Sequence, residues 1–408
     1  MRRSPARPRV KAAQAETFAA DARVAGSVAT PLDELEAARV LREAGARGDA
    51  VVAFGGGTLQ GIGNPPRTLE LALSTRRLDA IFAYDYRDLT IGAGAGLTLA
   101  RLNSALAQHK QFIPLDAPHP SRATLGGTLA AGWLGPRRAR YGRPRDLLIG
   151  TTAALADGTL AHSGGMVVKN VTGYDLSKLY VGSLGTLGVL TRTNFKTLPI
   201  PQGFRLAVAP LPEGTRERAA QHVRGLALEP TAALLFSGFR DVLPSPLAEG
   251  ADGTLLLLFE GSAAAIERAT RDLRSALGAA GVPQTRIFDA DAGAHQTFQR
   301  AIDAYVASIP GRSVTLRALG LPEGAMTRER AAREALEPAA AFLDTIVDLQ
   351  SGDLIARIFV DGKLDPLAVR GTLSDAVASL RERLPDAIVL ARGLPFDGEI
   401  DAWGAPPA

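Results

Sequence analysis

The 408-residue sequence contains no cysteine. This absence excludes disulfide bonds, thiol catalysis, cysteine-ligated iron–sulfur clusters and cofactors attached through cysteine. Histidine is also scarce, and the five present do not cluster with the spacing of metal ligands, so we expect no metal site. No apolar run reaches the roughly 20 residues of a membrane-spanning helix, so we expect no transmembrane segment. The histidines are His109, His119, His162, His222 and His295.

The rest of the composition is that of an ordinary globular chain. With 46% hydrophobic and 22% charged residues, it is long enough for two or three domains. Positive charge and proline are concentrated at the N-terminus, MRRSPARPRV, which lacks the apolar core of a signal peptide. We interpret residues 1–26 as a basic tail. A nucleic-acid-binding arm is the alternative, although no base-reading module accompanies it.

The first glycine loop follows a predicted helix and a short strand. The helix begins near Pro31 and ends by Gly48, and the strand covers residues 50–54. The strand runs directly into the GGGT sequence of residues 55–58. Consecutive glycines after a strand present several backbone N–H groups in one concavity, which suits a pyrophosphate. The alternative is a flexible loop, and the strand directly before it favours the anion-binding interpretation.

A second strand, glycine run and helix occupy residues 89–107 and have the outline of a dinucleotide-binding unit. Their glycine spacing is G-x-G-x-G, however, and not the G-x-G-x-x-G of that unit. The acidic residue at the expected distance, Asp116, lies in a proline-rich loop and not after a second strand. We therefore reject a nicotinamide site and expect this stretch to serve strand-to-helix packing.

Five arginines lie within nine residues, between segments that contain glycine turns. They suit nucleic-acid phosphates, and such a site would bind with a steep dependence on salt. They equally suit a solvated loop that faces a partner or a phosphate-bearing cofactor, and the flanking turns favour this second interpretation. We therefore expect no nucleic-acid partner. The five are Arg137, Arg138, Arg140, Arg143 and Arg145.

The densest glycine run is residues 164–188, GGMVVKNVTGYDLSKLYVGSLGTLG, with six glycines in 25 residues. A predicted hairpin at residues 148–160 precedes it, and a β-branched strand begins at Val189. Glycine recurs in this way where backbone approaches backbone or a flat ligand closely. For any single glycine a turn is the better interpretation, but for the whole run we favour a ligand-binding backbone.

The order of these segments resembles one known family. The motifs are GGGT, IGAGAG with a helix, TLGGTLAAG, YGRPRDLLIG, ADGT and KNVTGYDLSKLYVGSLGTLGVLT. Together they resemble the FAD-binding domain of vanillyl-alcohol-oxidase-type (PCMH-type) flavoproteins, most of all the FAD-binding subunits of bacterial glycolate oxidases. The resemblance covers residues 28–199 and implies an α+β fold in which two subdomains clasp an extended FAD. We accordingly place an FAD-binding domain at residues 27–199.

The resemblance also implies cofactor contacts at particular positions. The pyrophosphate would lie on the GGGT loop, and the ribityl and diphosphate along the TLGG motif. The flavin would lie near the glycines that follow, and the adenine side or dinucleotide backbone near the last glycines. In that order, the implied FAD-binding residues are Gly55, Gly56, Gly57 and Thr58; Thr124, Gly126 and Gly127; Gly132, Tyr141 and Gly142; and Gly185, Leu187, Gly188 and Val189.

Two further expectations concern how the cofactor is held. Family members often attach FAD covalently through cysteine or through a histidine near the glycine loop, and residues 54–63 contain no histidine. We therefore expect non-covalent FAD. A cation at the flavin ring would stabilise the reduced anionic form, and Lys169 is a candidate, but a surface lysine is an equally good interpretation. Asp175 and Lys178 are spaced to pair with each other on a helical turn.

Residues 200–408 have a different pattern, in which strands and helices alternate. We expect an α+β cap domain with an antiparallel sheet and helices on one face. Arg317 and Arg357 lie on predicted strands, where they would either bind a substrate carboxylate or face solvent. Strands are predicted at 204–210, 232–236, 254–260, 314–319, 354–360 and 387–391, and helices at 213–225, 262–279, 294–307, 327–346 and 366–383.

The resemblance implies an FAD-dependent oxidoreductase of the 2-hydroxy-acid oxidase or dehydrogenase type. In a first hypothesis the chain is the FAD-binding subunit of a glycolate-oxidase-type complex, with a catalytic flavin subunit, an iron–sulfur subunit and a small 2-hydroxy acid substrate. In a second it is a stand-alone oxidoreductase of another 2-hydroxy acid or alcohol, and in a third a non-catalytic scaffold that holds FAD. The few acid/base residues of the cap favour the first and third. The expected location is the cytoplasm, with any contact to the inner membrane made through partners. No catalytic residue is assigned.

Overall fold

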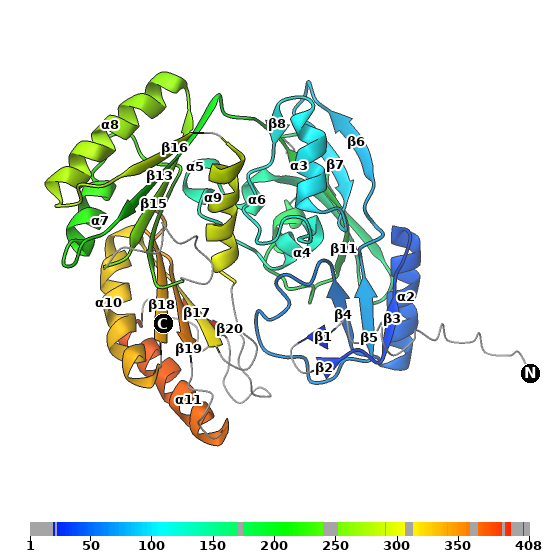
Figure 1. Ribbon diagram of the computed structural model, residues 1–408. Coiled ribbons are helices and arrows are strands. Elements are labelled where there is room, and N and C mark those ends of the chain that lie inside the picture. The colour runs from blue at the N-terminus through cyan, green and yellow to red at the C-terminus, as the bar shows by residue number, and fades with distance from the viewer. Residues whose placement is uncertain are drawn as a thin grey trace, which may run out of the picture.

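The computed structural model describes residues 19–20, 23–169, 174–239, 252–289, 291–306, 313–340, 342–359, 366–385 and 388–392, and Trp403. Two halves lie side by side: an N-terminal half with several small sheets and a C-terminal half built on one large sheet (Figure 1). Most of the expected tail, residues 1–26, lies outside the described residues. Its described end contains a two-stranded ribbon, β1 (Ala19–Ala20) with β2 (Arg23–Val24).

The first subdomain of the N-terminal half is a three-stranded parallel sheet in the order β3–β5–β4. Helix α2 connects β3 to β4, which lie on opposite sides of β5 and both run parallel to it, so the connection is a helical crossover. Asp33 caps the start of α2 by accepting from the backbone N–H of Glu36, and Gly48 ends it in a left-handed conformation at φ 73°. The elements are β3 (Ser27–Ala29), α2 (Glu34–Arg47), β4 (Val51–Phe54) and β5 (Leu71–Ser74).

The second subdomain is a five-stranded antiparallel sheet in the order β10–β9–β11–β7–β6. Helix α3 covers it with Leu99, Leu102 and Leu106, all fully buried in one apolar cluster with Ile91 and Phe195 of the sheet. The elements are β6 (Ile81–Asp85), β7 (Thr90–Gly94), α3 (Leu99–Ala107), β9 (Leu148–Ala154), β10 (Leu160–Gly164) and β11 (Val189–Lys196). Shorter elements between them are β8 (Gln111–Phe112), α4 (Leu125–Ala130), α5 (Arg138–Tyr141), α6 (Pro144–Leu147), η1 (Leu176–Leu179) and β12 (Leu198–Pro199).

The C-terminal half is an eight-stranded antiparallel sheet in the order β16–β13–β15–β14–β18–β19–β17–β20. Helices α7, α8, α10 and α11 lie on its outer face, while α9 lies between the sheet and the N-terminal half (Figure 1). The strands are β13 (Gly203–Pro210), β14 (Ala232–Ser237), β15 (Thr254–Gly261), β16 (Arg286–Asp289), β17 (Ser313–Leu319), β18 (Phe342–Asp348), β19 (Leu354–Phe359) and β20 (Ile388–Arg392). The helices are α7 (Arg216–Arg224), α8 (Ala263–Ala279), α9 (Ala292–Ala304), α10 (Ala325–Leu336) and α11 (Pro366–Arg383), with short 3-10 turns η3 (Pro322–Gly324) and η4 (Glu337–Ala339).

Strand β15 shows why this sheet is buried on both faces. Its side chains alternate, so Leu255 and Leu257 pack in the outer apolar cluster, whereas Leu256 and Leu258 pack in the inner one. The inner cluster also contains Trp133 of the N-terminal half. The continuous TLLLLFEG sequence is therefore the pattern of a strand covered by the helices on one side and by α9 and the N-terminal half on the other.

The expected α+β architecture is confirmed, with three corrections in the cap. The helix expected at 327–346 ends at Leu336, because Pro338 follows and the buried sequence FLDTIVD forms β18. Strand β16 was not expected, since its four residues carry little apolar patterning. The cap helices do not all lie on one face, because α9 packs on the inner side. No helix in the described part of the chain is both long and apolar enough to cross a membrane.

Candidate functional site

Three glycine-containing segments that are far apart in sequence meet around one cavity of about 340 Å³, here called the glycine cavity. The end of β4 and the GGGT loop form one wall, the start of α4 forms a second, and the segment before β11 forms a third. The residues that line it are Val51, Val52, Ala53, Phe54, Gly55, Gly56, Gly57, Thr58, Leu59, Gln60, Ile62, Asn64, Pro66, Thr75, Thr124, Gly126, Gly127, Ala130, Ala131, Leu184, Gly185, Thr186, Gly188, Val189 and Leu190.

The GGGT loop needs its glycines because it packs directly on the segment before α4. A Cβ atom at Gly56 would overlap the carbonyl oxygen of Arg122, and one at Gly55 would overlap the hydroxyl of Thr124. Gly57 has open space around it but a φ of 73°, which L-residues rarely adopt. At Gly55 and Gly56, therefore, the protein's own backbone and side chain exclude a Cβ.

This packing leaves the amide edge of the loop available to a ligand. Arg76 donates from Nε to the carbonyl of Gly55 at 2.7 Å, and Arg122 donates from Nη2 to the carbonyl of Gly56 at 3.2 Å. Within the described part of the chain, no acceptor pairs with the backbone N–H groups of Gly55, Gly56 and Gly57. Successive N–H donors around a concavity suit a phosphate or pyrophosphate.

The third wall is tied to α4 by backbone hydrogen bonds. The N–H of Gly182 donates to Leu129 at 3.0 Å, and the N–H of Leu184 donates to Ala130 at 2.7 Å. Leu184 itself adopts a left-handed conformation at φ 52°, which is strained for a residue with a branched side chain. Its neighbour Gly185 has φ 77°, and a Cβ there would make only an ordinary contact with Ala53 at 3.7 Å. Gly185 is therefore required by the turn.

Ten of the fourteen predicted cofactor-binding residues line this cavity. Gly132, Tyr141, Gly142 and Leu187 do not. Gly132 has φ 59°, and its Cβ would lie 2.9 Å from the Cα of Gly182, so it allows two turns to pack together. Leu187 is half exposed. Whether any of the fourteen touches FAD remains a prediction.

Tyr141 lies at the junction of the two halves. Its ring packs edge-on against Phe112, with a centroid distance of 5.6 Å. Burial raises the pKa of the Tyr141 phenol to about 12, and the negative charge of Glu260 adds to the effect. The hydroxyl therefore stays protonated at neutral pH.

Two of the five arginines that we expected to face a partner or a phosphate instead form ion pairs within the protein. Arg137 bonds from Nε to Asp116 at 2.6 Å and from Nη1 to Glu260 of β15 at 3.3 Å. Burial lowers the pKa of Arg137, but the attraction of these two carboxylates outweighs it and the pKa is raised. Arg138 reaches the cap as well, with Nη2 at 2.8 Å from Asp353. The expectation of a solvated loop is wrong for these two, which tie the halves together.

Arg138 belongs to a buried cluster that also holds Arg317, Tyr305 and two carboxylates of the cap. Arg317 bonds to Asp353 at 2.6 Å, and Arg138 lies 3.9 Å from Asp348. Burial raises the pKa of Asp348, an effect that Arg138 partly opposes. Burial and the charge of Asp348 likewise raise the pKa of Tyr305. We call these five residues the junction cluster.

The two cap arginines that were candidates for binding a substrate carboxylate are both occupied. Arg317 is in the junction cluster, where it also donates to the carbonyl of Leu134 at 3.0 Å. Arg357 is fully buried, bonds to Asp344 at 2.5 Å, and lies over the ring of Phe239. The alternative of a solvated sheet face is therefore also wrong for them.

Lys169 lines a separate cavity of about 250 Å³, with Arg145, Lys178 and Lys196 among its other residues. It does not line the glycine cavity. Lys178 pairs with Asp175 at 3.0 Å, as expected for neighbours on a helical turn. The role of Lys169 beside the flavin remains a prediction.

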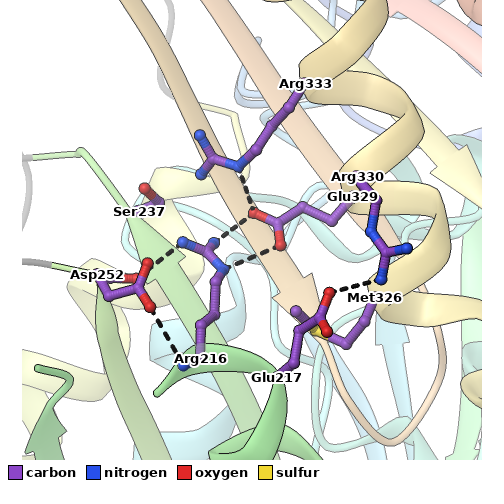
Figure 2. Close-up of a pocket in the computed structure, with 8 residues that line it drawn as sticks. All are labelled: Arg216, Glu217, Ser237, Asp252, Met326, Glu329, Arg330 and Arg333. Atoms are coloured by element: carbon purple, nitrogen blue, oxygen red, sulfur yellow. Dashed lines mark hydrogen bonds and ion pairs between the residues drawn. The ribbon is translucent and has the colours of Figure 1, made fainter. Parts of the chain in front are cut away.

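A charged cavity of about 350 Å³ lies on the outer face of the cap, between α7 and α10 (Figure 2). Its arginines already have acidic partners. Arg216 and Arg333 both bond to Glu329, and Arg330 bonds to Glu217 at 2.6 Å. Because the charges neutralise one another, this cavity is a less suitable cofactor site than the glycine cavity, whose N–H donors remain available.

Comparison with known proteins identifies the class of the N-terminal half. Residues 25–175 match the family described as FAD binding domain. This match assigns an FAD-binding domain, and with it FAD as the cofactor, to this part of the chain. A solved structure of alkyldihydroxyacetonephosphate synthase matches 86% of this chain and 71% of its own, with a TM-score of 0.62 at 15% identity, which shows that the fold is shared.

Three curated relatives carry the likeness further. The chain is 44% identical over 131 residues to glycolate oxidase subunit GlcE of Escherichia coli, covering 32% of this chain and 37% of that protein. It is 33% identical to D-lactate dehydrogenase of Archaeoglobus fulgidus, covering 45% and 41% of the two chains. It is 32% identical to glycolate oxidase subunit GlcD of Bacillus subtilis, covering 45% and 39%. The matched part therefore spans less than half the length of each of these relatives.

The glycine cavity fits FAD by the chemistry of its lining. The N–H groups of residues 55–57 suit the negatively charged diphosphate, and Thr58 and Thr124 add hydroxyl groups. Ile62, Leu184 and Val189 offer apolar surface to the flat rings. When bound, FAD supplies hydride acceptance at its flavin ring, and the protein supplies position and electrostatics.

Sequence reasoning missed much of the loop after the GGGT sequence. Leu59, Gln60, Ile62, Asn64 and Pro66 line the cavity, and so do Ala130, Ala131, Leu184 and Thr186. Only their nearness in sequence to the glycine motifs could have pointed to them, because their residue types are common to ordinary loops.

Proposed function

We propose that this chain is the FAD-binding subunit of a complex that oxidises a small 2-hydroxy acid, and that a second flavin subunit completes the chemistry. The observation that carries this proposal is the lining of the glycine cavity, in which no described residue has a titratable side chain. The cavity can hold a dinucleotide by its backbone, but it offers no group to accept a proton.

Oxidation of a 2-hydroxy acid removes a hydride from C2 and a proton from the hydroxyl group. The proton requires a base within hydrogen-bonding distance of the hydroxyl. The histidines of the cap are engaged elsewhere: His222 bonds through Nδ1 to the carbonyl of Arg218 at 3.0 Å, and His295 packs on the ring of Phe204 at 4.0 Å. Within the described residues, no three His, Cys, Asp or Glu side chains are grouped to hold a metal.

The substrate carboxylate needs a cation that is not already neutralised. The two cap arginines considered for this role each have a carboxylate partner, Asp353 for Arg317 and Asp344 for Arg357. Replacing such a partner by substrate would leave a buried carboxylate uncompensated, at a cost of several kcal/mol. This supports substrate oxidation on a partner subunit or with partner residues.

The names of the relatives support the substrate class, because they include glycolate oxidase subunits and a D-lactate dehydrogenase. An iron–sulfur cluster with cysteine ligands has to be on another chain, because this one has no cysteine. Through such partners the complex would reach the inner membrane from the cytoplasm. The proposed units of this chain are an FAD-binding domain at 27–199 and a cap at 200–408.

The test is turnover with glycolate and D-lactate, followed with a dye acceptor. The purified chain should carry FAD and show no turnover alone, and co-expression with its partner subunits should produce activity. Turnover by the single chain at the rate of the complex would support instead a stand-alone oxidoreductase, as the dehydrogenase relative suggests.

The same preparation tests how FAD is held. We propose non-covalent binding because the chain has no cysteine and the described residues lining the glycine cavity include no histidine. Acid denaturation should release all the yellow colour into the supernatant. Colour retained in the pellet would contradict this and would direct attention to His109, His119 and His162.

A further inference from the structure

The loop from Leu59 to Pro66 has two different neighbours. Toward the N-terminal half it lines the glycine cavity. Toward the cap, Leu59 and Ile62 pack against the inner apolar cluster, which contains Trp133, Phe298 and Tyr305. The loop is therefore a wall of the cofactor cavity that the cap holds in place.

At the centre of this loop, Gly63 lies against a residue 340 positions further along the chain. A Cβ atom at Gly63 would lie 2.7 Å from Cζ2 of Trp403 and 3.4 Å from its Nε1, so the indole edge covers the glycine backbone. Gly63 also has φ 90°, a conformation that favours glycine. Trp403 is 38% exposed, so most of its surface is covered by the protein.

We propose that Trp403 is a positioning residue for FAD: its indole holds the 59–66 loop in the shape that forms one wall of the glycine cavity. A loop with glycine at its centre has several accessible conformations, and each unproductive one lowers the apparent affinity for the ligand. An aromatic side chain packed on the loop reduces that number at small entropic cost to itself, because Trp has only two side-chain torsions.

This role does not depend on which substrate is oxidised, or on whether the chain acts alone. It depends only on FAD binding, so it is measured on the purified chain without substrate. Failure of the proposed complex would leave it unaffected.

The experiment compares Trp403→Ala, Trp403→Phe and a control, Phe342→Ala. Phe342 is a cap aromatic that is 74% exposed and does not line the glycine cavity. Apoprotein of each is titrated with FAD. We expect the Kd of Trp403→Ala to rise about tenfold, the effect of losing a well-packed aromatic contact, with Trp403→Phe recovering most of the affinity. Phe342→Ala should bind like wild type.

A second readout follows the loop directly. Arg67 is exposed, and it is the one trypsin site in the sequence between Arg47 and Arg76. Cleavage after Arg67 in the apoprotein should be several-fold faster in Trp403→Ala, because local opening governs proteolysis. Unchanged Kd and unchanged cleavage in a folded Trp403→Ala protein would overturn the proposal. So would an equal loss of affinity in Phe342→Ala, because that would indicate a general effect of the cap.

Discussion

The glycine cavity and the junction cluster are built from opposite materials. The cavity is formed by backbone and by uncharged side chains, and its N–H groups are its main polar feature. The junction cluster is formed by charged side chains from both halves, with Arg138 and Arg317 facing Asp348 and Asp353. The N–H groups of the first suit a ligand, whereas the charges of the second pair with one another and connect the two halves.

This difference predicts different responses to mutation. In the cavity, an added atom overlaps the protein, so the damage is local and steric. In the junction, a removed atom leaves charge buried without compensation, so the damage is electrostatic and affects the whole fold. The predictions below test this contrast, from the largest expected effect to the smallest.

Arg138→Ala should have the largest effect. It leaves Asp348 without its cation and Asp353 with Arg317 alone, and breaking a buried ion pair in this way costs about 3–5 kcal/mol of unfolding free energy. Denaturant unfolding of the apoprotein measures it. The control is Arg39→Ala, which removes an exposed pair with Glu43 and should cost less than about 1 kcal/mol. Similar losses of unfolding free energy in both variants would show that the buried ion pairs of the junction cluster stabilise the fold no more than an exposed pair does.

Gly56→Ala should follow, with an expected cost of about 1–3 kcal/mol and a loss of FAD. The new Cβ overlaps the carbonyl of Arg122, so the loop has to move and its N–H groups no longer converge. Thermal melting of the apoprotein and the flavin content after gel filtration measure the two effects. Gly278→Ala in α8 is the control, because nothing lies near its Cβ and alanine favours a helix. A variant that keeps full flavin would place the cofactor elsewhere.

Gly185→Ala should cost about 1–2 kcal/mol, the penalty for a left-handed alanine. Because the strain lies in the turn, the loss should be equal with and without FAD, and FAD should still give its full stabilising shift. Melting curves in both conditions measure it. A loss confined to the FAD-bound protein would show instead that the ligand's own atoms exclude the methyl group.

The contrast also explains how much of the molecule could be predicted from its sequence. Backbone-built sites need glycine at fixed local spacing, so the GGGT loop and the 185–189 segment could be located from the sequence and line the cavity. The ion pairs between the two halves could not be located from the sequence, because partners such as Arg137 and Glu260 are 123 residues apart and nothing local distinguishes a paired arginine from a solvated one. For the same reason the solvated-loop interpretation was wrong for Arg137 and Arg138, whereas Arg140, Arg143 and Arg145 are exposed.

In the cap, strand β18 was mistaken for helix because the alanine-rich sequence before it favours helix locally. Burial between β14 and β19 decides the outcome, and that is a property of the sheet as a whole. The contact of Trp403 with Gly63 is another case, since neither residue's neighbours in sequence indicate the other.

The smallest effect concerns pH and comes from Asp348→Asn. Burial raises the pKa of Asp348 above the ordinary value of an aspartate, so the folded protein holds this proton more tightly than the unfolded chain does. The stability that the carboxyl contributes is therefore fully present below that unfolded pKa and is lost as pH rises through the folded pKa. Asparagine does not titrate, but its amide oxygen can still accept the N–H bonds that Gln350 and Ser351 now donate to Asp348.

The melting temperatures of wild type and Asp348→Asn, measured from about pH 4 to about pH 8, should therefore change differently with pH. The melting temperature of the variant should rise relative to that of wild type as pH increases. The FAD Kd should stay the same at each pH, because Asp348 belongs to the junction and not to the described lining of the glycine cavity. A difference in melting temperature that is independent of pH would mean that Arg138 keeps Asp348 charged in the fold despite its burial. A change in FAD affinity would mean that the junction cluster influences the shape of the glycine cavity, and the two sites would then have to be treated as one.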